Sequence, residues 1–201
     1  FIAIDTENVT PENRKFFKDL ANKYKDRNIF AIVSTDGDSD RPFVIDEEGE
    51  FHRGDVLGIV VSQYLKADFA AVPISSNNAV EIQFKQDGIP LKFTKIGSPR
   101  VISAMNEAIA QGKRSVVSWE VNGGFLTGTD FVINSNALKA LPTRDTFLPI
   151  LCALLQAKEK DLSVSRLFAQ LPPRYTQAGL LDNFPVEISR KMVRHFSPPQ
   201  D

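Results

Sequence analysis

The chain has 201 residues, of which 42% are hydrophobic, and this is enough for one large or two small globular cores. Its 24 Lys and Arg residues nearly balance 25 Asp and Glu residues, for a net charge of −1. That balance argues against nucleic acid or a membrane surface as the main partner. The longest apolar stretch, residues 147–155, is too short to span a bilayer, and the start lacks a signal-peptide layout.

The single cysteine, Cys152, lies in an apolar helical pattern and has no second cysteine to pair with. We expect a small core residue rather than a reactive thiol, in a protein of a reducing compartment such as the cytoplasm. Because the chain begins with Phe1 rather than Met and already reads as a strand there, we also expect a piece of a longer protein.

The first fifty residues predict a helix and a strand hairpin. Thr10 and Pro11 form a good helix start, and Phe17, Leu20 and Ala21 then recur with helical spacing. Strands are expected at residues 1–4, 29–34 and 42–46, with a turn at 46–49 that closes the hairpin.

From about residue 51, strands alternate with longer helices. Asp55 is expected to cap a helix, and Thr143 is expected to cap a long apolar helix that runs to Lys158. Strands are expected at 69–74, 91–96 and 115–119, and further helices after residues 78 and 97, at 163–171 and near 186–196. This alternation predicts an α/β fold, in layers of helix, sheet and helix with mixed sheets. We expect three parts, residues 1–50, 51–178 and 179–201.

The strongest functional signal is an acidic loop, residues 35–41, which directly follows the strand at 29–34. Asp36, Asp38 and Asp40 occupy alternate positions, and Arg41 follows at once. Crowded carboxylates repel one another, so they favour a bound cation, and hard oxygen ligands suit Mg²⁺ or Ca²⁺. The arginine offers a planar charged fork for phosphate. Together they predict a site that handles a phosphoryl group.

An EF-hand calcium loop is the first rival, because the three aspartates and Glu47 fall at its positions 1, 3, 5 and 12. However, Arg41 stands where that loop needs glycine, and the preceding segment reads as a strand rather than a helix. A solvated acidic turn without a ligand is the other alternative.

Two more loops follow predicted strands. The Gly97 loop, residues 94–100, combines Gly97, Ser98 and Arg100 at a helix start, which suits an anion, although Gly-Ser-Pro is also a common helix entry. The Glu120 loop, residues 119–124, places Glu120 and Asn122 two residues apart before Gly123, an arrangement that suits sugar hydroxyls. Trp119 is either core or pocket lining. His52 and His195 read as surface residues.

Taken together, the three loops resemble those of the α-D-phosphohexomutases, the phosphomannomutase/phosphoglucomutase family. Residues 35–41 match the family's metal loop, Asp-Gly-Asp-x-Asp-Arg; residues 95–98 are similar to its phosphosugar loop, and residues 120–124 to its Gly-Glu-x-Ser-Gly signature. Arg144 and Asp145 are similar to the opening of the helix that follows in the family.

The resemblance implies a four-domain enzyme that interconverts hexose 6-phosphate and hexose 1-phosphate through a phosphoserine and a bisphosphate. Residues 1–50 would belong to domain two, 51–178 to domain three and 179–201 to the link toward domain four, so the phosphoserine lies outside this chain and the fragment alone is inactive. It implies Mg²⁺ on Asp36, Asp38 and Asp40, Arg41 at the phosphoryl group, and hexose-phosphate contacts from the other loops. Those contacts fall to Glu120, Asn122, Gly123, Gly97, Ser98 and Arg100.

This chain departs from the family pattern in two places. Asn122 stands where serine is usual, and Gly124 replaces a histidine found in many members. Residues 5–8 and Ser98-Pro99 favour a phosphomannomutase branch. A haloacid-dehalogenase-type phosphatase and a non-catalytic module that binds metal or sugar phosphate remain as alternatives.

Overall fold

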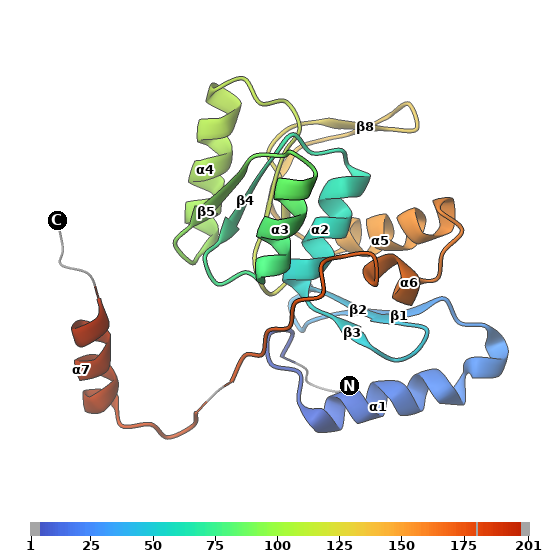
Figure 1. The fold of residues 1–201 in the computed structure, drawn as a ribbon, viewed down its shortest axis with the longest axis horizontal. Helices are drawn as coiled ribbons and strands as arrows, with labels where there is room; N and C mark the ends of the chain where they lie inside the picture. The colour runs from blue at the N-terminus through green and yellow to red at the C-terminus, as the bar shows by residue number, and fades with distance from the viewer. Residues whose placement is uncertain (1–4, 180, 198–201) are drawn as a thin grey trace.

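The computed structural model describes residues 5–179 and 181–197, and it contains two β-sheets flanked by helices and one small separate hairpin (Figure 1). The strand expected at residues 1–4 lies outside the described residues. Within the described residues, no helix combines the length and the apolar character that crossing a bilayer requires.

The first sheet contains three antiparallel strands, β1 (Ala31–Thr35), β2 (Pro42–Asp46) and β3 (Phe51–His52). Helix α1 (Pro11–Lys23) covers it, and a short 3₁₀ turn, η1 (Lys25–Arg27), follows. The aromatic rings of Phe17, Phe43 and Phe51 form the core between helix and sheet, with centroids 5.3 and 4.6 Å apart. The Thr10 hydroxyl accepts a hydrogen bond from the Asn13 amide, as the sequence predicts for a helix cap.

The second sheet has five strands in the order β10-β7-β6-β4-β5. β4 (Phe69–Pro73) pairs in parallel with β5 (Leu91–Thr94) and with β6 (Val116–Trp119). β7 (Phe125–Thr127) and β10 (Leu141–Asp145) are antiparallel additions beyond β6. The expected mixed α/β architecture is therefore confirmed.

Helices cover both faces of this five-stranded sheet (Figure 1). Phe69 and Ala71 of β4 face α4 (Ser98–Ala110), whose Met105 is fully buried. Ala70 and Val72 face the other side, which α2 (Gly54–Tyr64), α3 (Asn78–Gln86) and α5 (Phe147–Glu159) cover. This alternation is the period of two that a strand imposes. Three layers of helix, sheet and helix result.

The two sheets share part of one core. Val44 of β2 belongs to the same buried cluster as Cys152 and Ala153 of α5. A second link comes from α6 (Val164–Phe168), where Ser165 bonds the Glu47 carboxylate through its amide and its hydroxyl. The acidic loop is therefore held in a defined position relative to the five-stranded sheet.

Several of the sequence predictions are wrong. Residues expected to lead into a helix at Thr143 form the strand β10, and α5 begins only at Phe147. Asp55 is not the N-cap of α2, because Arg53 occupies that position. The buried Asp55 carboxylate instead accepts a hydrogen bond from the backbone amide of Asn77 at 3.0 Å. His52, which was expected at the surface, lies in β3 with its side chain only 15% exposed. β7 and a hairpin, β8 (Phe131–Ile133) and β9 (Asn136–Leu138), were not foreseen.

Helix α7 (Val186–Phe196), predicted near 186–196, stands apart from the sheets (Figure 1). Its apolar side chains are exposed, among them Ile188, Met192 and Phe196.

Candidate functional site

The acidic loop is the connection between β1 and β2. Thr35 pairs with Pro42 across the hairpin, and the Asp36 amide donates to the Arg41 carbonyl at 3.2 Å, which closes the loop. The Asp36 carboxylate then accepts the backbone amides of Asp40 and Arg41, both at 3.1 Å. Because strands and not helices flank this loop, the EF-hand alternative is excluded.

The loop brings its three carboxylates together. Asp36, Asp38 and Asp40 each offer an oxygen atom within 4.8 Å of the other two. Asp38 is exposed, whereas the Oδ1 atom of Asp40 is buried and has no hydrogen-bond partner among the described residues. Clustered oxygen ligands, one of them buried and without a hydrogen bond, fit a hard divalent cation such as Mg²⁺. The residues present therefore fit the predicted metal site.

Arg41 lies across the same loop. Its Nε atom is 3.5 Å from Asp36 Oδ2 and 3.5 Å from Asp40 Oδ1. The side chain remains about one-third exposed, so it is placed beside the aspartates without being enclosed. A cation in this position can contact an anion that approaches the carboxylate cluster.

The Glu120 loop follows β6 and lies against the first sheet. Gly123 has a φ of +93°, and a Cβ there would meet Pro42 Cγ at 2.9 Å and Gly54 Cα at 3.1 Å. Only glycine allows this backbone to pass so closely with that conformation. The close approach sets the distance between the Glu120 loop and β2, the strand that follows the acidic loop.

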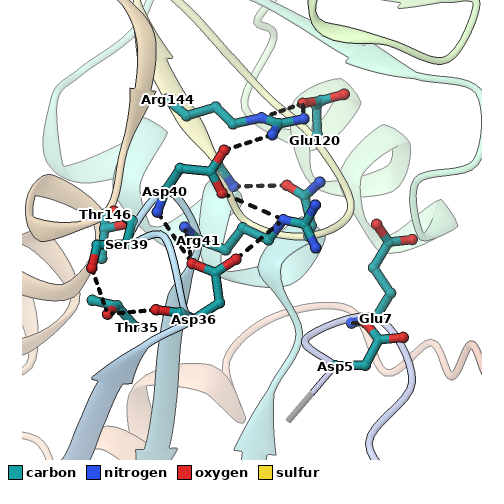
Figure 2. A network of polar contacts seen from close by, with 12 residues as sticks. Asp5, Glu7, Thr35, Asp36, Ser39, Asp40, Arg41, Glu120, Arg144 and Thr146 are labelled. Atoms are coloured by element: carbon teal, nitrogen blue, oxygen red, sulfur yellow. Dashed lines mark hydrogen bonds and ion pairs between the residues drawn. The ribbon is translucent and has the colours of Figure 1, made fainter. Parts of the chain in front are cut away.

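Arg144 joins the two loops (Figure 2). Its Nη1 atom is 2.7 Å from Asp40 Oδ2, while Nη2 and Nε lie 2.6 and 2.8 Å from Glu120 Oε2. The pKa of Arg144 is raised: burial acts to lower it, but the hydrogen bonds and charges of Asp40 and Glu120 outweigh burial. The sequence placed Arg144 at the start of a helix, and this is wrong; as a residue of β10 it points between the loops.

Thr146, which no motif in the sequence marks as functional, makes a second link from the same segment. It precedes α5, is buried, and its hydroxyl donates to the Ser39 carbonyl of the acidic loop at 2.9 Å. Neither Arg144 nor Thr146 belongs to a local motif that would have identified its contact. Their partners in the acidic loop, Asp40 and Ser39, are more than one hundred residues earlier in the chain.

The Gly97 loop reaches the same site through one residue. The Ser98 hydroxyl donates to Glu120 Oε2 at 2.8 Å, so three donors converge on that oxygen. Gly97 has a φ of +117° where it precedes α4. Arg100 is exposed, and its side chain makes no hydrogen bond or ion pair within the described part of the chain. A cavity of about 260 Å³ has Asp40, Ser98 and Arg144 in its lining.

Asn122 is buried in the Glu120 loop, and its Oδ1 atom accepts the Gly124 amide at 3.0 Å. The side-chain oxygen thus stabilises the loop itself, which leaves the amide nitrogen for other contacts. Cys152 is buried, and Trp119 is fully buried, so both are core residues.

Comparison with known sequences gives a consistent result. Residues 53–175 match the family described as "Phosphoglucomutase/phosphomannomutase, alpha/beta/alpha domain III". A phosphomannomutase of Salmonella muenchen is 42% identical over 195 residues, which cover 96% of this chain and 39% of that protein. A phosphomannomutase of Sinorhizobium fredii is 39% identical over 193 residues, covering 96% and 40%. The chain thus spans about two-fifths of the length of these relatives.

Solved structures share the fold. A phosphoglucomutase/phosphomannomutase family protein from Burkholderia thailandensis matches with a TM-score of 0.59 at 17% identity, over 81% of this chain and 33% of that one. The pp63/parafusin phosphoglucomutase from Paramecium, in an open form, matches with a TM-score of 0.56 at 15% identity, over 82% and 28%. Because residues 53–175 match the family model and the chain is similar to both phosphomannomutases, it belongs to the phosphoglucomutase/phosphomannomutase family.

Proposed function

We propose that the full-length protein is a phosphohexomutase of the phosphomannomutase type, which interconverts hexose 6-phosphate and hexose 1-phosphate. The similarity to two phosphomannomutases supports this proposal. The observation that carries it is the ion-pair bridge through Arg144, because it brings a cluster of metal-ligand type together with a loop of sugar-binding type. A metal site and a hydroxyl-binding site that contact the same arginine side chain suit a ligand that carries both a phosphate and sugar hydroxyls.

In this proposal, Asp36, Asp38 and Asp40 hold Mg²⁺, which would neutralise charge on a phosphoryl group. Arg41 contacts the phosphoryl oxygens with its guanidinium. Glu120 accepts hydrogen bonds from sugar hydroxyls through Oε1, since Oε2 is already occupied by three donors. Transfer of a phosphoryl group depends on positioning and charge neutralisation more than on covalent chemistry from the protein.

The remaining contacts to the hexose phosphate fall to Asn122, Gly123, Gly97, Ser98 and Arg100. Arg100 is the least constrained of these, because its exposed side chain is free to turn toward a ligand. The phosphoserine and the bisphosphate intermediate belong to the same proposal, and residues outside this chain supply the phosphoserine. Residues 1–201 alone are then expected to bind Mg²⁺ weakly and to turn over nothing. A cytoplasmic location is part of the proposal, supported by the free thiol of Cys152.

A coupled mutase assay on the full-length gene product tests the function. Mannose 1-phosphate and glucose 1-phosphate are compared side by side, with Mg²⁺ and a bisphosphate primer present. We expect turnover that falls by at least about tenfold in Asp38→Asn, because one of three charged ligands is lost. Asp182→Asn, an exposed aspartate away from the loops, is the matched control and keeps full activity. No turnover of either sugar phosphate would contradict the proposal.

A haloacid-dehalogenase-type phosphatase is not favoured. In that class the first aspartate of the loop is itself phosphorylated, whereas here Asp36 Oδ1 accepts two backbone amides and Oδ2 faces Arg41. That carboxylate is used to build the loop and is poorly placed as a nucleophile.

A further inference from the structure

Glu120 and Asp40 share a single cationic partner. Asp40 comes from the β1–β2 hairpin and Glu120 from the loop after β6, and Arg144 contacts both at 2.6–2.8 Å. The Glu120 side chain is only 7% exposed, so its negative charge requires compensation inside the protein. The orientation of Glu120 and that of Asp40 are therefore set by one side chain.

Arg144 and Ser98 leave one oxygen of each carboxylate available. Arg144 occupies Asp40 Oδ2, while Asp40 Oδ1 is buried, makes no hydrogen bond in the described residues and lies 3.5 Å from Arg41 Nε. Arg144 and Ser98 occupy Glu120 Oε2, which leaves Oε1 for a ligand. A metal ion and a sugar hydroxyl can thus each bind without displacing Arg144.

The chain makes room for this arginine at Gly124. A Cβ at that position would meet Arg144 Cδ at 2.7 Å and Cγ at 2.8 Å, closer than side chains pack. Gly124, the residue that departs from the family pattern, therefore leaves the space that the Arg144 side chain fills where it reaches both loops.

We infer that Arg144 couples the two loops, so that divalent-metal binding at the acidic loop and hexose-phosphate binding at the Glu120 loop strengthen each other. The inference rests on the proposed function. A ligand that orders either loop also fixes the guanidinium, and this lowers the entropic cost of ordering the other loop. The coupling is reciprocal by thermodynamic necessity. Only a planar fork can contact both carboxylates at once, so lysine cannot replace this arginine.

The test is a pair of calorimetric titrations on the full-length protein. Mg²⁺ affinity is measured with and without saturating mannose 1-phosphate, and the heat of Mg²⁺ added to the sugar phosphate alone is subtracted. In the wild type we expect the Kd for Mg²⁺ to fall by about fivefold or more when the sugar phosphate is present. In Arg144→Met and in Arg144→Lys the ratio of the two Kd values is expected to be close to one.

Two controls separate coupling from general damage. Arg166→Met removes an exposed arginine on α6 and is expected to keep the wild-type ratio. Gly124→Ala displaces the Arg144 side chain without removing it, and it should lose most of the coupling. Gly179→Ala, whose new Cβ has no atom of the described residues within 4 Å beyond its chain neighbours, should keep it. Gly124→Ala also decides the question if Arg144→Met fails to fold.

The outcomes distinguish the two proposals. If the wild type binds both ligands but with a ratio of one, or if the ratio persists in Arg144→Met and Gly124→Ala, the coupling inference is wrong and the proposed function stands. If the wild type binds neither Mg²⁺ nor mannose 1-phosphate, the proposed function fails and the inference fails with it.

Discussion

The indole ring of Trp119 occupies the place that a side chain at Gly58 would take. A Cβ on Gly58 would lie 2.3 Å from ring atoms of Trp119. The indole N–H donates to the Asp55 carbonyl at 3.0 Å, and the ring stacks on Phe125, with centroids 5.8 Å apart. Helix α2 thus holds the end of β6, the residue directly before Glu120. The position of the Glu120 loop depends on this packing.

Gly58→Ala is expected to destabilise the protein in spite of a better helix propensity. Alanine would gain about 1 kcal/mol over glycine within a helix. Overpacking of a full core costs about 1–3 kcal/mol, and three ring atoms within 2.4 Å place this site at the upper end of that range. We expect a net loss of about 1–2 kcal/mol in the free energy of unfolding, measured by urea denaturation. The control Gly179→Ala should leave it unchanged, and a stabilised Gly58→Ala would show that α2 moves freely against Trp119.

Asp38→Asn is expected to lower the metal affinity without harming the fold. The Asp38 side chain is exposed, and in the metal-free protein it adds to the repulsion among three carboxylates whose oxygens lie within 4.8 Å. Neutralising it should leave the melting temperature unchanged or slightly higher. The Kd for Mg²⁺, measured by calorimetry, should rise by about tenfold or more. Unfolding of this variant, with normal folding of Asp182→Asn, would mean that the cluster is structural.

The Asp46 carboxyl makes stability fall in acid. Its pKa is lowered: burial acts to raise it, but the hydrogen bonds from His52 and from the Glu50 and Glu48 amides outweigh burial. Since an unfolded aspartate has a pKa of about 3.9, the unfolded chain takes up this proton first as the pH falls. The contribution is therefore complete above about pH 5 and is lost as the pH falls through the folded-state pKa.

Asp46→Asn should reduce the slope of unfolding free energy against pH between about 5 and 3, and lower stability at neutral pH by about 1–3 kcal/mol. Urea denaturation at several pH values checks both effects. The exposed control Asp182→Asn should keep the wild-type slope. An unchanged slope in Asp46→Asn would assign the acid sensitivity to other carboxylates.

Local pattern predicted the elements that are buried or well capped. β2 agrees with the expected strand at 42–46, because all five of its residues are buried and the four before Asp46 are apolar. β10 was missed since Leu141, Pro142 and Thr143 are exposed, so the strand carries no alternation and contains a proline. Asp55 resembled a helix cap, but a tertiary hydrogen bond to Asn77 determines its position.

The site was predictable to the extent that it depends on neighbours in sequence. The carboxylate cluster follows from alternate aspartates in one tight turn, and the structure places them together as expected. The ion pairs of Arg144 could not be read in this way. They join residues 24 and 104 positions apart, and such contacts follow from the packing of β10 beside β7 rather than from any local spacing.

Cys152 is expected to be unreactive in the folded protein. Burial, with a smaller effect from the Asp145 charge, raises the pKa of its thiol to about 12. At pH 8 the folded protein then holds about a thousandfold less thiolate than an unperturbed cysteine, and the thiolate is the reactive species. A disulfide reagent such as DTNB should therefore modify the native protein only as fast as it unfolds, and modify it at once in urea. Immediate stoichiometric reaction of the native protein would show that α5 opens locally around Cys152. In that case α5 would not be a stable part of the shared core that positions the acidic loop.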